Sequence, residues 1–230
     1  MPLLTTRTEG SVLVVELQRA ERGNALNRQL QRELSAAWQD FEDRDELKVA
    51  VLAGSPDVFS IGHDVAELAS GTGEDASPVP DPGIFPMSLS KPVIAAVEGP
   101  CYGLGFELAL ACDLRVAGED AIFGIPDLDL AAPYRVASVL LPRMTFMGQS
   151  AELMFSGKTL DARTANARRL VNTVTPKGQA LATAVSAATS MVQHFGDAGA
   201  FRKREIWGLS GVPLPYAMTV VRETGPGAFR

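Results

Sequence analysis

The sequence predicts an α/β fold with substantial parallel strand pairing. Short apolar runs of strand-forming residues alternate with longer segments whose apolar residues recur at helical spacing. Two of these runs, Leu47–Gly54 and Lys91–Gly99, are almost wholly apolar, as is typical of strands covered on both faces. A chain of 230 residues is long enough for one large domain, or for one domain with a small appendage, and no internal repeat is evident.

The first strand and the first long helix come early in the chain. The run "SVLVVEL" (Ser11–Leu17) is rich in β-branched residues, which favour strands. After the turn "RAERGNALN", Asn27 is a suitable N-cap for a helix. Residues 28–44 then carry apolar side chains at helical spacing, which predicts a helix with one buried face formed by Leu30, Leu34, Ala37, Trp38 and Phe41.

Two segments each predict a strand, a glycine turn and the start of a helix. In "VFSIGHDVAEL" the turn lies at Gly62 and His63, with Asp64 in the first helical turn, and in "GPCYGLGFELALAC" Gly103 and Gly105 begin the helix. The first N–H groups of a helix lack partners within it, and the helix dipole favours negative charge there. Two such ends facing one cleft would form an oxyanion hole. Simple strand-to-helix turns, which are commoner, also fit the pattern.

The rest of the chain is less regular. The segment Ser70–Ser88 is rich in Gly, Pro, Ser and Asp, which predicts a mobile surface loop. The residues after Gly157 predict a turn, a short helix and a strand. A helix from about Gly178 to His194 follows, and the pattern from Gly196 onward is weak.

Composition limits the classes of partner. A net charge of −6 argues against nucleic acid, because phosphate binding needs a basic face. Cys101 and Cys112 predict small buried thiols rather than a disulfide framework. No window approaches the ~18 unbroken apolar residues of a membrane span, and the N-terminus lacks the features of a signal peptide. We therefore expect a soluble cytoplasmic protein that binds neither nucleic acid nor membrane.

Common catalytic motifs are missing from the sequence. A dinucleotide-binding GxGxxG fails because Leu108 stands where the third glycine would follow Gly103 and Gly105. Neither GxxxxGK[ST] nor GxSxG occurs. The two histidines, His63 and His194, are far apart and have no neighbouring cysteine ligands, so we expect no metal site.

Two carboxylates in apolar surroundings are the main candidates for chemistry. Glu107 interrupts an apolar helical run, and Asp127 follows a strand-like run, "AIFGI". Paired carboxylates in a dry cleft can take different protonation states, so that one serves as acid and the other as base. On spacing alone, however, an arginine partner for Glu107 and a turn-capping role for Asp127 are favoured.

Three stretches together resemble the enoyl-CoA hydratase/isomerase (crotonase) superfamily: "FSIGHDVAEL", "KPVIAAVEGPCYGLGFELALACDLRVAGEDAIFGIPDLDL" and "LPRMTFMGQSAELMFSGKTLDARTANARRLVNTVTP". The similarity runs in one order from about Asn24 to Pro176. It implies a crotonase-like spiral of ββα units over residues 1–176 that carries the active site. It also implies a shortened C-terminal helical region, residues 177–230, for trimerisation or as a lid, and assembly as a homotrimer or hexamer.

The resemblance further implies a coenzyme A thioester substrate, with coenzyme A as part of the substrate and no separate cofactor. The backbone N–H groups of His63 and Leu104 would bind the thioester carbonyl. Glu107 would activate a water, and Asp127 would exchange a proton at the α-carbon, so that water adds across an α,β-double bond. The stretch "RGNALN" resembles the loop that lines the coenzyme A pocket, and further substrate or coenzyme A contacts are expected at Ala25, Leu26, Gly62, Asp64 and Gly103.

The sequence departs from the family pattern in three places. Asp127 stands where the hydratases have a glutamate. Tyr134 and Arg135 stand where small residues are usual, so we expect either a narrower or remodelled pocket, or a site that no longer holds water there. The C-terminal stretch "GVPLPYAMTVVRETGPGAFR" does not resemble the family's basic helices. Besides a hydratase, the residues are compatible with an enoyl-CoA isomerase, an acyl-CoA hydrolase or decarboxylase, or a scaffold that binds acyl-CoA without turnover.

Overall fold

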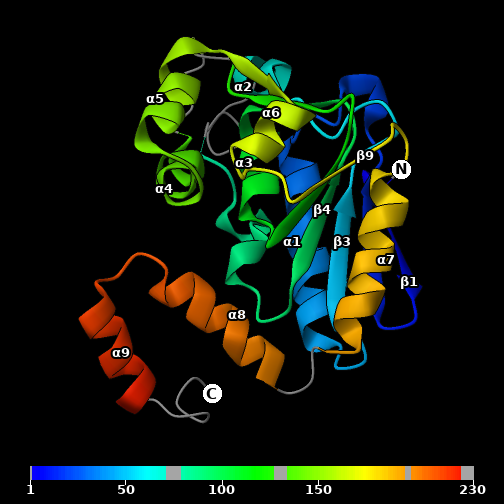
Figure 1. Ribbon diagram of the computed structural model, residues 1–230. Helices are drawn as coiled ribbons and strands as arrows, with labels where there is room; N and C mark the ends of the chain where they lie inside the picture. Colours follow the sequence, from blue (N-terminus) through cyan, green and yellow to red (C-terminus); the bar gives the residue numbers. More distant parts are fainter. Residues whose placement is uncertain (1, 71–78, 127–133, 195–197, 224–230) are drawn as a thin grey trace.

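A six-stranded sheet forms the centre of the computed structural model, which describes residues 2–70, 79–126, 134–194 and 198–223 (Figure 1). Its strand order is β1-β2-β3-β4-β6-β9, and every neighbouring pair is parallel except β1 with β2. The bounds are β1 (Leu4–Glu9), β2 (Val12–Leu17), β3 (Val49–Ala53), β4 (Val93–Val97), β6 (Leu114–Gly118) and β9 (Thr173–Thr175). The predicted α/β class and its parallel pairing are confirmed. The polar edge strand β1 was not predicted, because its residues are mostly exposed and lack a buried face.

A second, smaller sheet branches from the first. It contains β5 (Pro100–Tyr102), β7 (Ile122–Gly124) and β8 (Thr159–Asp161). β5 pairs with β7 in parallel, and β7 pairs with β8 in antiparallel fashion. Only Gly99 and Glu98 separate β4 from β5, so the chain passes from the large sheet into the small one immediately before the second predicted glycine turn.

Helices cover both faces of the large sheet. Alternate residues of each strand point to opposite sides, and apolar residues on both sides need to be buried. On one face, Leu13, Leu52 and Ala95 pack with α1 (Arg28–Asp43) and α3 (Gly103–Ala111). On the other face, Val12, Val51 and other strand residues pack against the alanines of α7 (Ala180–Val192). Figure 1 shows α7 on the opposite side of the sheet from α1 and α3. The predicted helix 178–194 is confirmed to within two residues at each end.

The first long helix begins where the sequence indicated. The Asn27 side chain accepts a hydrogen bond from the Leu30 N–H at 2.9 Å, which caps α1. Leu30, Trp38 and Phe41 are buried, as the helical spacing predicts.

The prediction of a surface loop over residues 70–88 is wrong for its second half. Residues 71–78 lie outside the described part of the chain. Residues 82–88 form two 3-10 turns, η3 (Pro82–Ile84) and η4 (Pro86–Ser88), and Ile84 and Phe85 are buried in the core. The Trp38 indole N–H donates to the Ile84 carbonyl at 2.9 Å. The polar composition of the whole segment concealed this short apolar stretch.

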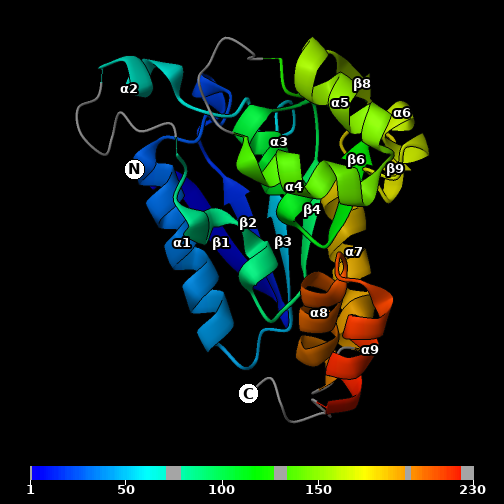
Figure 2. The same ribbon diagram turned by 90° about the vertical axis from the view of Figure 1, so that its left-hand side faces the viewer.

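The remaining helices surround one end of the sheets and extend beyond the other. They are η1 (Ala20–Arg22), α2 (Val65–Ser70), α4 (Arg135–Met144), α5 (Met147–Ser156), α6 (Ala162–Ala167), α8 (Ala198–Leu209) and α9 (Leu214–Glu223). Figures 1 and 2 both place α8 and α9 at the end of the molecule opposite α2 and α5. The weak sequence pattern after Gly196 did not define these two helices, although the family resemblance implied a helical region over residues 177–230.

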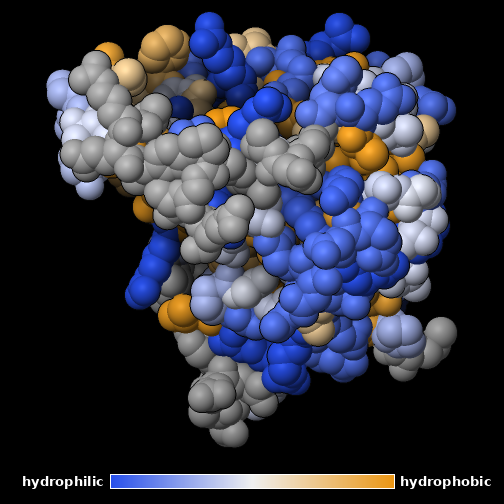
Figure 3. Space-filling view, turned by 90° about the horizontal axis from the view of Figure 1, so that it is seen from below, coloured by the Kyte–Doolittle hydropathy of each residue, from blue (hydrophilic) through white to orange (hydrophobic). Residues whose placement is uncertain are grey.

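Buried polar contacts attach α8 to the core. The Lys203 ammonium is 2.8 Å from Asp113 and donates to the carbonyls of Pro86 and Lys91 at 2.9 and 2.8 Å. The Trp207 indole N–H also donates to Asp113, at 2.7 Å. Most of the residues coloured in Figure 3 are hydrophilic, and the hydrophobic ones form small separate groups. Within the described residues, no helix has the length and apolar character needed to cross a membrane.

Candidate active site

Two segments of chain, residues 57–63 and 98–104, lie side by side, and we call them the first and second arms. The N–H groups of Phe59 and Ser60 donate to the Pro100 carbonyl, both at 3.1 Å. The Tyr102 N–H donates back to the Ser60 carbonyl at 2.9 Å. Each arm ends in one of the predicted glycine turns, so the pairing brings the two turns together.

The glycines allow the ends of the arms to approach closely. Gly62 has φ +99° and Gly103 has φ +51°, which are backbone conformations that residues with a side chain rarely adopt. A methyl group on the Gly62 Cα would lie 2.9 Å from the Tyr102 carbonyl oxygen and 3.1 Å from the Leu104 nitrogen. The chain after Gly62 therefore lies against the first turn of α3.

This contact brings two backbone donors to neighbouring positions. Leu104 is in the first turn of α3, where an N–H has no acceptor within the helix. None of the hydrogen bonds recorded between described residues uses the N–H of Leu104 or that of His63. Two such donors can bind an oxygen atom that acquires negative charge.

Glu107 is one turn further along α3 and is almost completely buried, with 1% of its surface exposed. Its Oε1 accepts a hydrogen bond from the Ala137 N–H, in the first turn of α4, at 2.8 Å. Burial raises the pKa of Glu107 to about 7, although the N–H groups of Ala137 and Val136 lower it. The recorded partner is thus a helix N-terminus and not an arginine. A carboxyl group with this pKa can take or give a proton near neutral pH.

Tyr134 immediately precedes α4 and is also buried. Its backbone is left-handed, with φ +30° and ψ +50°, and its ring lies 6.2 Å from the His63 ring, centroid to centroid. Burial, and then the charge of Arg28, lower the pKa of His63 to about 4, so its imidazole is neutral at pH 7. Of the two bulky residues that the sequence analysis singled out, Tyr134 therefore lies beside His63, whereas Arg135 is exposed.

The structure does not place every predicted site residue beside the two backbone donors. Asp127 lies outside the described residues. Asp64 is 2.6 Å from the Arg19 guanidinium and accepts from the Glu67 N–H at 3.1 Å, which caps α2. Although burial raises the pKa of Asp64, the Glu67 N–H and Arg19 together hold it below its ordinary value.

The predicted coenzyme A contacts, Ala25 and Leu26, join their loop to the first arm. The Leu26 N–H donates to the Gly62 carbonyl at 2.7 Å. The Ala25 carbonyl accepts from Arg19 at 2.9 Å. Both residues are buried.

Sequence patterns did not single out Asn24 and Ser60, which support the first arm. Asn24 has φ +50°, and its side-chain amide donates to the Val58 carbonyl at 3.1 Å. The Ser60 hydroxyl donates to the Asn24 carbonyl at 2.8 Å and accepts from the Gly62 N–H at 3.2 Å. Only the "GN" pair before Ala25 could have indicated this, because Asn tolerates the left-handed region.

A cavity of about 840 Å³ lies between α4 and α8, away from the arms. Its lining includes Leu140, Met144, Lys203 and Trp207. Of the described residues predicted to form the site, none lines this cavity.

Comparisons with known proteins converge on one family. The family model described as "Enoyl-CoA hydratase/isomerase" matches residues 7–206. A "Putative enoyl-CoA hydratase" from Thermus thermophilus is 32% identical over 231 residues, covering 94% of this chain and 91% of the relative. A "Probable enoyl-CoA hydratase 2, mitochondrial" from Arabidopsis thaliana is 32% identical over 187 residues, covering 79% of this chain, which spans only 62% of that relative's length.

Solved structures agree with the sequence comparisons. The crystal structure of an enoyl-CoA hydratase from Mycobacterium tuberculosis superimposes with a TM-score of 0.89 at 28% identity, covering 97% of this chain and 88% of the other. The six-stranded sheet, the smaller sheet and the covering helices therefore form an arrangement already known from an enzyme.

Proposed function

The chain belongs to the enoyl-CoA hydratase/isomerase (crotonase) family, and from this premise we propose that it is an enoyl-CoA hydratase that reversibly adds water to a 2-enoyl-CoA thioester. The observation that carries the proposal is the position of Glu107, one helical turn beyond the Leu104 N–H, with a pKa of about 7. A carboxyl group that can change its protonation state thus stands close to two backbone donors.

The proposed reaction begins with the thioester carbonyl between the N–H groups of His63 and Leu104. Glu107 takes a proton from a water molecule, whose oxygen forms a bond to C3 of the enoyl group. The electron pair of the double bond moves toward the thioester, and the negative charge on its oxygen is stabilised by the two N–H groups. A proton delivered to C2 by Asp127 then completes the 3-hydroxyacyl product. Glu107 loses the proton it took and Asp127 regains one by exchange with solvent, which restores both carboxyl groups. Loss of one such N–H typically costs 10²–10³ in rate.

An enoyl-CoA isomerase is the second candidate, because the buried Tyr134 ring lies beside His63 and reduces the space for water. In that reaction one carboxyl group would move a proton between two carbons, and no water would be incorporated. Glu107, with its pKa of about 7, suits this role as well. Hydrolysis or decarboxylation of an acyl-CoA would use the same two donors.

Isotope labelling separates the candidates. The purified protein would be incubated with crotonyl-CoA and with a 3-enoyl-CoA, in ordinary and in ¹⁸O-labelled water, and the products identified by mass spectrometry. Hydration predicts ¹⁸O in a 3-hydroxyacyl product, whereas isomerisation predicts unlabelled 2-enoyl-CoA from the second substrate. No turnover of either, with unchanged acyl-CoA binding in Glu107→Ala and Asp127→Ala variants, would overturn both enzymatic proposals and favour the scaffold.

We also propose assembly as a homotrimer or hexamer, as expected from the family. Large apolar side chains are exposed on the C-terminal helices: Ile206 on α8 and Leu214, Tyr216 and Met218 on α9. Covering such a surface removes apolar area from water and favours association. Light scattering during size-exclusion chromatography would measure the mass, and a monomer at all concentrations would refute the assembly.

A further inference from the structure

Two carboxyl groups meet at the ends of adjacent strands, away from Glu107. Glu98 follows β4 and Asp120 follows β6, its neighbour in the large sheet. Both face Gly118, where a methyl group would overlap Glu98 Oε2 and lie 3.0 Å from Asp120 Oδ1. These two oxygens are buried, and no donor for either is recorded among the described residues.

The other oxygen of each carboxyl group already has a partner. Glu98 Oε1 accepts from the Ala180 N–H, at the start of α7, at 2.9 Å. Asp120 Oδ2 is 3.2 Å from the Lys177 ammonium. An ionised carboxylate only accepts hydrogen bonds, so two facing carboxylates would leave both inner oxygens unsatisfied and mutually repelling. One proton held between them satisfies both.

The electrostatic surroundings assign this proton to Glu98. Burial raises the pKa of Glu98, and Asp120 raises it further, against the hydrogen bonds from Ala180 and Gly178. Although burial raises the pKa of Asp120, its contacts with Lys177 and Glu98 hold it below the ordinary value. The neutral Glu98 therefore donates to the ionised Asp120, whose charge Lys177 balances.

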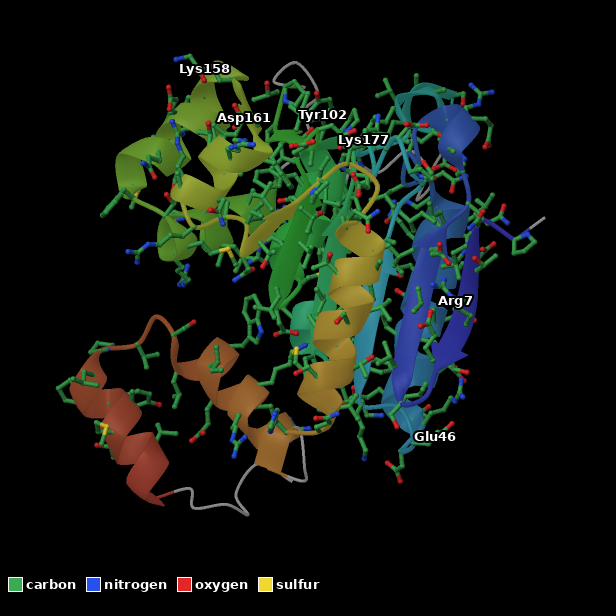
Figure 4. All side chains as sticks on the ribbon, turned by 45° about the vertical axis from the view of Figure 1, so that its right-hand side comes forward. Arg7, Glu46, Tyr102, Lys158, Asp161 and Lys177 are labelled. Carbon is green, nitrogen blue, oxygen red and sulfur yellow. The ribbon has the colours of Figure 1, made fainter. Side chains whose placement is uncertain are left out.

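The same cluster joins the bases of the two arms. Lys177 is also 3.6 Å from Asp57, the first residue of the first arm. Glu98 begins the second arm, and Gly99, with φ +58°, lies so close to the Asp57 carbonyl that a side chain there would overlap it. Figure 4 shows Lys177 and Tyr102 at the same end of the molecule. Equal lengths of chain lead from Asp57 to His63 and from Glu98 to Leu104.

We propose that Glu98 and Asp120 share a single proton and that this proton fixes the bases of the two arms, so that Glu98 is a positioning residue for the N–H groups of His63 and Leu104. The inference rests on the proposed function for its catalytic consequence, but not for the shared proton itself.

The pH at which Glu98 loses its proton defines how the stability of the protein should change. The stabilisation that comes from the raised pKa of Glu98 is complete at low pH and is lost as the pH rises through that pKa. Asp120, whose pKa is lowered, stabilises the fold in the opposite pH direction. Its contribution is present at neutral pH and is lost only in strong acid. The charged group that contacts the pair is Lys177, which is 3.2 Å from Asp120 and also 3.6 Å from Asp57. Further out, Glu119 lies 3.9 Å from Arg163 and Glu9 lies 3.1 Å from Arg7, so both of these acids are already partnered.

Nuclear magnetic resonance of the full chain, labelled with ¹³C and ¹⁵N, tests the inference without relying on activity. The Glu98 carboxyl carbon and the amides of His63 and Leu104 would be followed from about pH 5 to about pH 9. We expect Glu98 to lose its proton above the ordinary glutamate range, with both amides shifting along the same curve. In Glu98→Gln, whose amide donates permanently to Asp120, the part of the amide shifts that follows Glu98 should vanish and only the part that follows Glu107, with its pKa of about 7, should remain. The neighbouring Glu119→Gln control should titrate as wild type.

Kinetics provide the second readout. In wild type and Glu119→Gln we expect kcat to fall as the shared proton is lost, whereas Glu98→Gln should keep its kcat at alkaline pH with KM unchanged. Asp120→Asn, which also removes the repulsion, should behave like Glu98→Gln if the latter folds poorly. An ordinary Glu98 titration, or amide shifts in Glu98→Gln identical to those of wild type, would overturn the inference. Absence of turnover with the resonance results intact would instead count against the proposed function.

Discussion

The carboxylate of Glu107 accepts the Ala137 N–H at 2.8 Å and thereby joins the middle of α3 to the first turn of α4. Both ends of this bond belong to the candidate site, because α3 begins with the Leu104 donor and α4 follows Tyr134. The bond orients a buried acid whose other oxygen can serve a substrate. Structure and chemistry thus depend on the same carboxyl group.

Replacing Glu107 by Gln should separate these two roles. The amide oxygen of glutamine can still accept the Ala137 N–H, but the side chain can no longer take a proton from water. General acid–base catalysis contributes about 10²–10⁴, so we expect kcat for hydration of crotonyl-CoA to fall by a factor in that range with little change in KM. In wild type, the rate should fall as the pH drops below about 7, because Glu107 becomes protonated. Wild-type activity in this variant would exclude Glu107 as the base.

The same substitution should change how stability depends on pH. Glu107 has a pKa of about 7 in the folded protein and 4.5 as its ordinary value. The folded form holds the proton more tightly, so its stabilising contribution is complete below pH 4.5 and is lost as the pH rises through about 7. Denaturant unfolding should show wild type losing about 3 kcal/mol relative to Glu107→Gln over this rise. If the free energies of unfolding of wild type and Glu107→Gln changed in parallel with pH, the pKa of Glu107 would be ordinary and the prediction would be wrong.

A methyl group at Gly62 should damage the pair of donors. Ala at φ +99° is strained, and its methyl would press on the Tyr102 carbonyl and the Leu104 nitrogen. We expect Gly62→Ala to lose about 1–3 kcal/mol of stability and about 10²-fold or more in kcat. Gly148→Ala in α5 is the matched control, since nothing lies within 4 Å of its added methyl and its backbone is helical. Equal activities of the two variants would refute the importance of the close approach.

Tyr134 should limit the size of the acyl group. Glycine suits the left-handed backbone at this position, and its introduction removes the ring beside His63. We expect Tyr134→Gly to raise kcat/KM for longer enoyl-CoA chains relative to crotonyl-CoA by at least ~10-fold. Arg135→Ala, which changes an exposed neighbour, should leave this ratio unaltered. An unchanged ratio in Tyr134→Gly would mean that the ring lies outside the acyl site.

Local patterns predicted the parts of the fold in which sequence neighbours determine structure. The Asn27 cap, the buried face with Trp38 and the start of α3 at Gly103 follow from residue type and spacing. The path from Ile84 into the core did not follow, since four apolar residues inside a polar segment give too weak a signal. The family resemblance implied a helical region after residue 177, but the local pattern did not define α8 and α9. On α8, Lys203 contacts residues that are distant in sequence, which no local pattern can reveal.

The candidate site shows the same division. Sequence identified Glu107, Gly62 and Gly103, but contacts between distant segments decide what these residues touch. The raised pKa of Glu107 depends on burial, and its partner Ala137 is thirty residues away. The pairing of Glu98 with Asp120 needed the register of β4 and β6, which sequence spacing does not reveal.

Infrared spectroscopy of a bound thioester tests most directly whether the N–H groups of His63 and Leu104 bind the carbonyl. Crotonyl-CoA with a ¹³C-labelled thioester carbonyl would be bound to Glu107→Gln, in which turnover is slow, and its stretching frequency compared with that of free crotonyl-CoA in water. We predict a clear shift to lower frequency, because two backbone donors polarise the carbonyl more strongly than water does, and a smaller shift when Gly62→Ala is added. A bound carbonyl with the same frequency as in water would contradict the account.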